Sequence, residues 1–197
     1  MALKLNAYPI DTASDLSPTW GSTTLADFEL SLTDPNSVQT KSYSIPASAT
    51  RSLGFITPSG EPNSDDFTDS ASNWVITERV TTATDVMDLR FRVQVHRLNS
   101  SGTIQESSGY GSYFTLTAGS SDNIDLDVNH TFSTGNCSDR FAVEVEVENT
   151  NTMKSVDLEW RLNDATYNDW AWNTEQFDYD TSTCTGGSTF VPKCVMF

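Results

Sequence analysis

The clearest pattern along the chain is an alternation of apolar and polar residues with a period of two. It occurs in four segments, whose apolar positions are Leu89, Phe91, Val93 and Val95; Ile124, Leu126 and Val128, with Phe132 four residues further on; Phe141, Val143, Val145 and Val147; and Val156, Leu158, Trp160 and Leu162. A helix would distribute these residues around its axis, whereas a strand places them on one face. The pattern therefore predicts antiparallel strands with one face in the core and the other in water.

Shorter segments with weaker alternation predict further strands at 25–32, 41–45, 74–80 and 112–117. Asn99-Ser100-Ser101-Gly102 separates two strand-like segments and offers a glycine for a positive φ, so it predicts a hairpin turn. About eight short strands with no helical pattern indicate an all-β protein, a two-sheet antiparallel β-sandwich.

The patterns divide the chain into three parts. Residues 70–165 contain the clear strands and are predicted to form the sandwich core. Residues 1–60 are predicted to supply an N-terminal arm or additional strands. Residues 166–197 combine aromatic residues and cysteines without alternation, which indicates an extended C-terminal segment.

Charge narrows the range of partners. The 197 residues include 27 Asp and Glu against 11 Lys and Arg, a net charge of −16. Nucleic acids and anionic membranes bind basic surfaces, so neither is expected as a partner. The first ten residues lack the apolar core of a signal peptide, and we expect synthesis in the cytoplasm.

The sequence offers few candidates for catalytic or metal-binding residues. Glu144, Glu146 and Glu148 fall on the polar face of their strand, and we expect them to be solvated, with nothing to raise their pKa. His96 lies on the polar face of its strand and His130 lies near a strand end, and structural roles are expected for both because no GxSxG elbow or orienting group accompanies them. We therefore expect no catalytic residues, no enzymatic activity, no metal and no cofactor, although loop carboxylates leave calcium open.

Three cysteines allow two interpretations. Cys137, Cys184 and Cys194 have no CxxC spacing, and three free thiols suit a protein made in the cytoplasm. The alternative is a disulfide between Cys184 and Cys194, which would close a small loop.

The aromatic residues after residue 163 are candidates for contact with a partner. Trp170 and Trp172 would lie on the same side of an extended segment, with Phe177 and Tyr179 beyond them; Trp20 is a further candidate. The aromatic residues could stack on a sugar, dock on a partner protein, or pack over the end of the sandwich.

The region from Trp74 to Leu162 resembles β-sandwich structural proteins of tailed bacteriophages. The similarity centres on the strand Asp88–Gln94 and its continuation, which ends in Arg97-Leu98-Asn99, turns through Ser100-Ser101-Gly102-Thr103 and returns through Gln105. Such proteins include capsid decoration (cement) proteins and tail or fibre components with jelly-roll folds.

This resemblance implies a jelly-roll-like fold without catalytic residues. It also implies a homo-oligomer, with a trimer favoured, that binds the major capsid protein or another virion protein on the capsid exterior. The expected function is therefore a non-enzymatic virion structural protein of the decoration type. The alternative is a carbohydrate-binding module or a receptor-binding tail or fibre domain that uses Trp170 and Trp172.

Overall fold

The computed structural model describes residues 5–31, 37–59, 72–82, 88–117, 121–130, 132, 136–162 and 170–173, and for β5, β12 and residues 5–7, 88, 117, 121–123 and 125 only the backbone. Within these residues the chain forms twelve strands and no helix. The strands are β1 (Leu5–Ala13), β2 (Thr23–Ser31), β3 (Gln39–Ile45), β4 (Thr50–Ile56), β5 (Ser72–Thr82), β6 (Asp88–Leu98), β7 (Ile104–Ser107), β8 (Phe114–Thr117), β9 (Ser121–His130), β10 (Arg140–Asn149), β11 (Val156–Leu162) and β12 (Trp170–Asn173).

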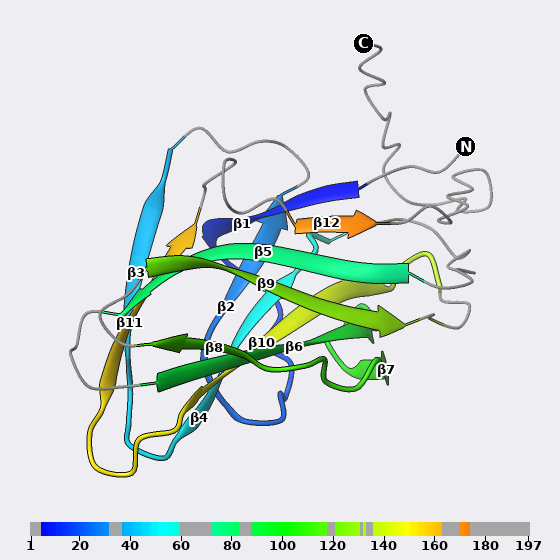
Figure 1. Ribbon diagram of the computed structural model, residues 1–197. Helices are drawn as coiled ribbons and strands as arrows, with labels where there is room; N and C mark the ends of the chain where they lie inside the picture. Colours follow the sequence, from blue (N-terminus) through cyan, green and yellow to red (C-terminus); the bar gives the residue numbers. More distant parts are fainter. Residues whose placement is uncertain are drawn as a thin grey trace.

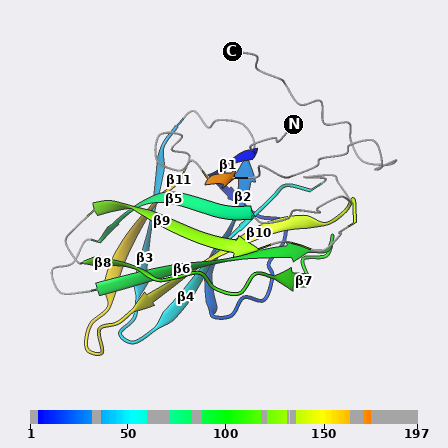
Figure 2. The same ribbon diagram turned by 45° about the vertical axis from the view of Figure 1, so that its right-hand side comes forward.

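The strands form two layers (Figures 1 and 2). In sheet A, β5 pairs with β9 along one edge and with β11 and β12 along the other, and β3 lies outside β11. Sheet B has the order β2-β4-β10-β6, with β7 and β8 both on the outer edge of β6. β1 joins the layers, because its first residues pair with β12 and its later residues pair with β2.

This architecture confirms the predicted all-β, two-sheet sandwich. Every strand pair is antiparallel except β2 and β4, which run parallel. The predicted hairpin is also present between β6 and β7. Gly102 has φ 82°, and the Asn99 side chain accepts the backbone N–H groups of Ser101 and Thr103.

The core lies between the layers and consists of the apolar positions of the alternating segments. These residues belong to one buried cluster, to which β2, β3 and β4 also contribute. The fully buried Trp160 lies near the middle of it, with ring centroids 5.8 Å from Phe55 and 6.4 Å from Phe91. The period-two interpretation therefore identified the core side chains of those four segments correctly.

Residues before 60 are integral to the sheets. β4 lies in the interior of sheet B, between β2 and β10, and its Leu53 and Phe55 are fully buried in the core. The first part of the chain thus supplies four strands and no separate arm within the described residues. Both predicted boundaries, near 60–70 and near 165, fall outside those residues and stay predictions.

Candidate functional site

The outer face of sheet B is covered over much of its area, although the alternation predicts that it lies in water. Residues 14–22, which connect β1 to β2 and are called here the covering segment, cross this face. A second buried apolar cluster lies beneath them, formed by Trp20, Ile56, Leu98 and Ala142 with the partly buried Leu16 and Ile104. The sheet is therefore sandwiched between the core and the covering segment.

The indole ring of Trp20 packs directly against the backbone of Gly54, which has no side chain to keep it away. A Cβ atom added to Gly54 would lie 2.2 Å from Asp27 Oδ1 and 2.4 Å from Trp20 Cζ2, so only glycine allows this approach. Trp20 Nε1 donates a hydrogen bond of 2.6 Å to Asp27, whose pKa is raised by burial against the opposing effect of the hydrogen bonds from Trp20 and Ser17. Trp20 is only 6% exposed and has a structural role beneath the covering segment, and its predicted contact with a partner stays a prediction.

Glu144 and His96 form a buried pair beneath the covering segment. Their side chains are 1% and 3% exposed, and Glu144 Oε2 lies 3.3 Å from His96 Nε2. Glu144 Oε1 accepts hydrogen bonds from the Ser52 hydroxyl and from the backbone N–H of Gly21. The prediction that this glutamate is solvated is wrong: it lies on the predicted face, but that face is covered.

The environment of Glu144 favours its charged form. Burial by itself raises the pKa of Glu144, but the interaction with His96 and the hydrogen bond from Ser52 together hold that pKa below its ordinary value. The carboxylate thus fastens the covering segment through Gly21, and Ser52 extends the contact to Ser22 at 2.6 Å.

A second ion pair fastens the start of the same segment. The buried Arg140 donates from Nη1 to Asp15 at 2.7 Å and from Nε to the carbonyl of Thr57 at 2.6 Å. The covering segment is therefore bound to β10 at both Asp15 and Gly21.

Residues 108–113, called here the bridging segment, connect β7 to β8 along the edge of β6. The backbone N–H groups of Ser108 and Gly111 donate to the carbonyls of Val95 and Val93, at 3.0 and 2.8 Å. A Cβ atom on Gly111 would lie 2.3 Å from the carbonyl oxygen of Asp127, so glycine allows β9 of sheet A to approach here. This segment joins the edges of the two layers.

The bridging segment also brings two tyrosines over the arginines of β6. The guanidinium carbon of Arg92 lies 3.9 Å from the ring centroid of Tyr110 and 4.7 Å from that of Tyr113, and that of Arg90 lies 4.1 Å from Tyr113. Each arginine also donates to a glutamate of β10. Arg92 Nε donates to Glu146 at 2.6 Å, and Arg90 donates to both carboxylate oxygens of Glu148 at 2.8 Å. This arginine–tyrosine ladder fixes the orientation of all its members.

Glu146 is buried as well, so its predicted solvation is wrong for the same reason as for Glu144. Only Glu148, with its side chain 23% exposed, retains substantial contact with water. Burial, followed by the charges of Glu144 and Glu146, raises the pKa of Tyr110. The phenol therefore stays protonated at neutral pH.

His96 lies between a hydroxyl and a carboxylate, an order typical of nucleophile–base–acid triads. Its Nδ1 is 2.7 Å from Ser107 Oγ on β7, opposite the contact with Glu144. A triad requires a substrate at the hydroxyl and hydrogen-bond donors for an oxyanion. Here the imidazole is covered by Trp20, with ring centroids 5.3 Å apart, and its two nitrogens hold β7 and β10 together. This geometry favours the structural role that the sequence predicts.

The other candidates from the sequence are His130, a metal site and the aromatic residues of the C-terminal segment. His130 Nε2 lies 3.3 Å from Glu106, and its ring meets Phe132 edge-on at 4.5 Å. Among the described residues, no group of three His, Cys, Asp or Glu side chains is placed to hold a metal. Trp170 and Trp172 lie in β12, where only the backbone is described, and Phe177 and Tyr179 lie outside the described residues. Partner contact by these four residues stays a prediction.

Cys137 is disulfide-bonded, which contradicts the interpretation of three free thiols. The chain has two other cysteines, Cys184 and Cys194, both outside the described residues. The predicted bond between Cys184 and Cys194 therefore stays a prediction.

The sequence interpretation missed the residues that cover sheet B and the glycine that lets them approach it. No periodic pattern would mark Ser22, Tyr110 and Tyr113 above the sheet or Gly54 within it. One signal was available: the strand segment Thr50–Ile56 contains a glycine, and glycine in a strand often marks a close approach of another group.

Comparisons with known proteins leave the family open. No family model and no curated protein matches the chain. Solved structures with some similarity include a CocE/NonD family hydrolase from Staphylococcus aureus, at 10% identity and a TM-score of 0.44, covering 86% of this chain and 36% of that one. They also include a structure of infectious bursal disease virus, Gx strain, at 14% identity and a TM-score of 0.34, covering 81% and 41%.

A third match is the VP2 subviral particle of infectious bursal disease virus, at 15% identity and a TM-score of 0.22, covering 78% of this chain and 45% of that one. The chain thus spans less than half the length of each of these structures. None is similar enough in shape to bear on what this chain does.

The part of the chain that the structure describes contains no helix able to cross a membrane.

Proposed function

We propose that the chain is a non-enzymatic structural protein of a virion, a decoration protein that binds the outside of a phage capsid as a homo-oligomer. Its partner is the major capsid protein. The all-β sandwich and the β6–β7 hairpin, which carries the similarity to phage structural proteins, support this proposal.

The observation that carries the proposal is how the polar side chains of sheet B are used. Glu144, His96, Arg92 and Glu146 bind one another or the segments that cross the sheet, and all but the partly exposed Arg92 are buried. These groups therefore stabilise the fold and fix its surface segments. A stable body with fixed loops is what a protein that binds to a particle requires.

The charge agrees with a position on a particle exterior. A net charge of −16 limits binding to nucleic acid and to other anionic material released from cells. The same charge requires the contact with the shell to be local and complementary, because long-range attraction to an acidic surface is absent.

Co-sedimentation tests the proposal. Purified protein is mixed with bare phage capsids at several salt concentrations and centrifuged. We expect the protein in the capsid pellet at a fixed ratio that saturates. Protein that stays in the supernatant at every salt concentration would exclude capsid decoration.

The second candidate function is a carbohydrate-binding or receptor-binding domain. One observation favours it: β12 is extended, as the interpretation of Trp170 and Trp172 as a sugar platform requires. Binding on a glycan array that disappears in Trp172→Ala would support this function, whereas no binding to any polysaccharide would count against it.

A further inference from the structure

Two turns meet at one end of the sandwich. The β3–β4 turn (46–49) and the β10–β11 loop (150–155) are joined by a hydrogen bond of 2.8 Å from the Ser48 N–H to the Asn151 carbonyl. We call these two turns the tip. The pairing of β11 with β3 places Val156 beside Ile45, so the tip lies at the opposite end of β3 from Gln39.

Asn149 and Asn151 hold the tip in one conformation. Asn149 is fully buried, and its Nδ2 lies within hydrogen-bond distance of the carbonyls of Ile45, Pro46 and Lys154, at 3.0, 3.1 and 2.8 Å. Asn151 Oδ1 accepts the backbone N–H groups of Met153 and Lys154, at 2.7 and 2.9 Å. The backbone at Met153 is therefore fixed from both sides of the tip.

The turn beside it has an unusual backbone. Ser48 has φ 55°, in the left-handed region that residues other than glycine seldom adopt. Such a conformation costs on the order of 1 kcal/mol and persists only where surrounding contacts impose it. Here the hydrogen bond to Asn151 is one of these contacts, so the two turns form one unit.

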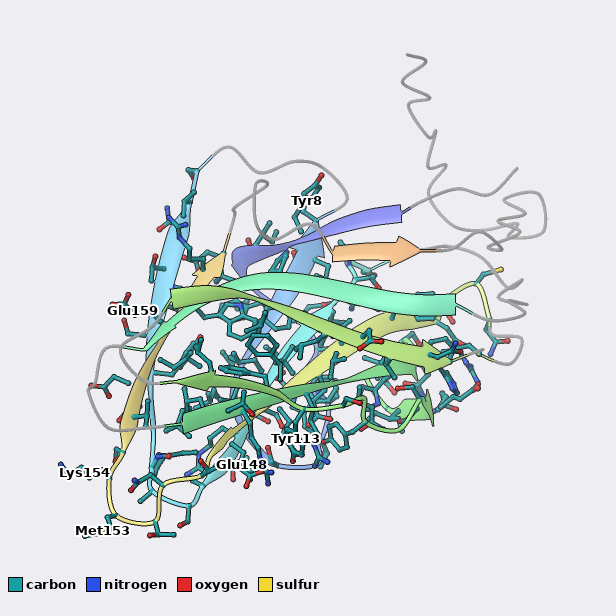
Figure 3. All side chains as sticks on the ribbon, viewed as in Figure 1. Tyr8, Tyr113, Glu148, Met153, Lys154 and Glu159 are labelled. Carbon is teal, nitrogen blue, oxygen red and sulfur yellow. The ribbon has the colours of Figure 1, made fainter. Side chains whose placement is uncertain are left out.

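This fixed unit exposes a large apolar side chain. Met153 is 85% exposed, far more than Val38 and Tyr113, the other large exposed apolar side chains among the described residues. Figure 3 shows Met153 and Lys154 at the extremity of the molecule. Lys154 is exposed and forms no ion pair with a described residue.

We propose that the tip is an interaction surface that inserts Met153 into an apolar pocket of the shell protein, with Lys154 meeting a carboxylate at its rim. This inference rests on the proposed function. Methionine is enriched in protein interfaces, and its flexible side chain fills irregular pockets. Because the asparagines already fix the loop, little conformational entropy is lost on binding.

Charge favours a protein pocket over a lipid surface. One methionine and one lysine bury little apolar area in a bilayer, and a chain with a net charge of −16 is repelled by anionic lipids. Lys154 is a cation placed on an otherwise acidic molecule, which suits a local contact with an acidic rim.

The test compares Met153→Asp with Val38→Asp, a matched control that adds the same charge at the other end of β3, where Val38 is 47% exposed. Binding of each full-length variant to bare capsids is measured by co-sedimentation. We expect Met153→Asp to weaken binding about tenfold or more, as for a hot-spot residue, and Val38→Asp to bind as the wild type does. Both positions are exposed, so thermal unfolding should be unchanged and should exclude misfolding.

Each outcome has a distinct meaning. If the wild type does not bind capsids, the proposed function fails. If the wild type binds and Met153→Asp binds equally well, or if both aspartate variants weaken binding equally, the inference about the tip is overturned. Binding of the wild type to vesicles of phosphatidylcholine and phosphatidylglycerol that Met153→Asp alone abolishes, with capsid binding intact, would also overturn it.

Asn151→Ala tests the fixed conformation separately. The variant keeps Met153 but removes the acceptor that holds its backbone. We expect faster dissociation from capsids with Met153 still exposed. An unchanged dissociation rate would contradict the role of a preformed tip.

Discussion

The buried Glu144–His96 pair should contribute strongly to stability through the mutual interaction of its members. Their facing atoms are 3.3 Å apart and both side chains are almost fully buried, so solvent screens them little. When His96 is protonated, the two opposite unit charges attract by about 5 kcal/mol at that distance and an effective dielectric constant of about 20. Removing one partner leaves the other charge buried without compensation, which typically costs roughly 3–5 kcal/mol.

The perturbation is a double-mutant cycle of Glu144→Gln and His96→Gln. Each single substitution should lower the free energy of unfolding by about 3–5 kcal/mol. The double variant should lose less than the sum, with a coupling energy of about 1–3 kcal/mol, because neither charge is then left alone. The cycle also removes the separate contribution of the contacts of His96 with Ser107 and Trp20.

Urea unfolding between pH 5 and 6 gives the four free energies, provided that the dependence on urea is the same for all variants. The control is Arg90 with Glu148, whose side chains are 38% and 23% exposed. Glu148→Gln should cost less than about 1 kcal/mol, as exposed ion pairs do. Additivity of the two buried substitutions within about 0.5 kcal/mol would show that the pair does not interact and would refute the reasoning.

Three further predictions concern pH, packing and the disulfide. Because the pKa of Glu144 is lowered in the folded state, its stabilising effect is complete above the ordinary value of 4.5 and is lost as the pH falls below it; urea unfolding should therefore depend less steeply on pH between 5 and 3 in Glu144→Gln than in the wild type. Gly54→Ala should lower the free energy of unfolding by about 1–3 kcal/mol, seen as a lower melting temperature, because the new methyl group meets Asp27 and Trp20; an unchanged melting temperature would contradict the close packing. Non-reducing peptide mapping should find Cys137 linked to Cys184 or Cys194, and the detection of a Cys184–Cys194 peptide instead would contradict the bond at Cys137.

The strands with clear alternation were predictable because the direction of a side chain in a strand depends only on its position along that strand. Phe91, Val143 and Trp160 are buried in the core as that rule requires. β4 escaped prediction because it is covered on both faces, by the core and by the covering segment. Its Ser52 and Gly54 break the apolar pattern, although both are necessary for contacts on the outer face.

The sequence by itself determined that the protein is an all-β sandwich, which residues of the four alternating segments lie in its core, and that Glu144 and His96 lie on the opposite face of sheet B. Only the tertiary structure decided that this face is covered. The contact between Gly21 and Glu144 spans 123 residues of sequence, and no periodic pattern records which loop crosses a sheet. Local sequence sets the direction of a side chain, whereas its exposure to water depends on the distant segments that fold over it.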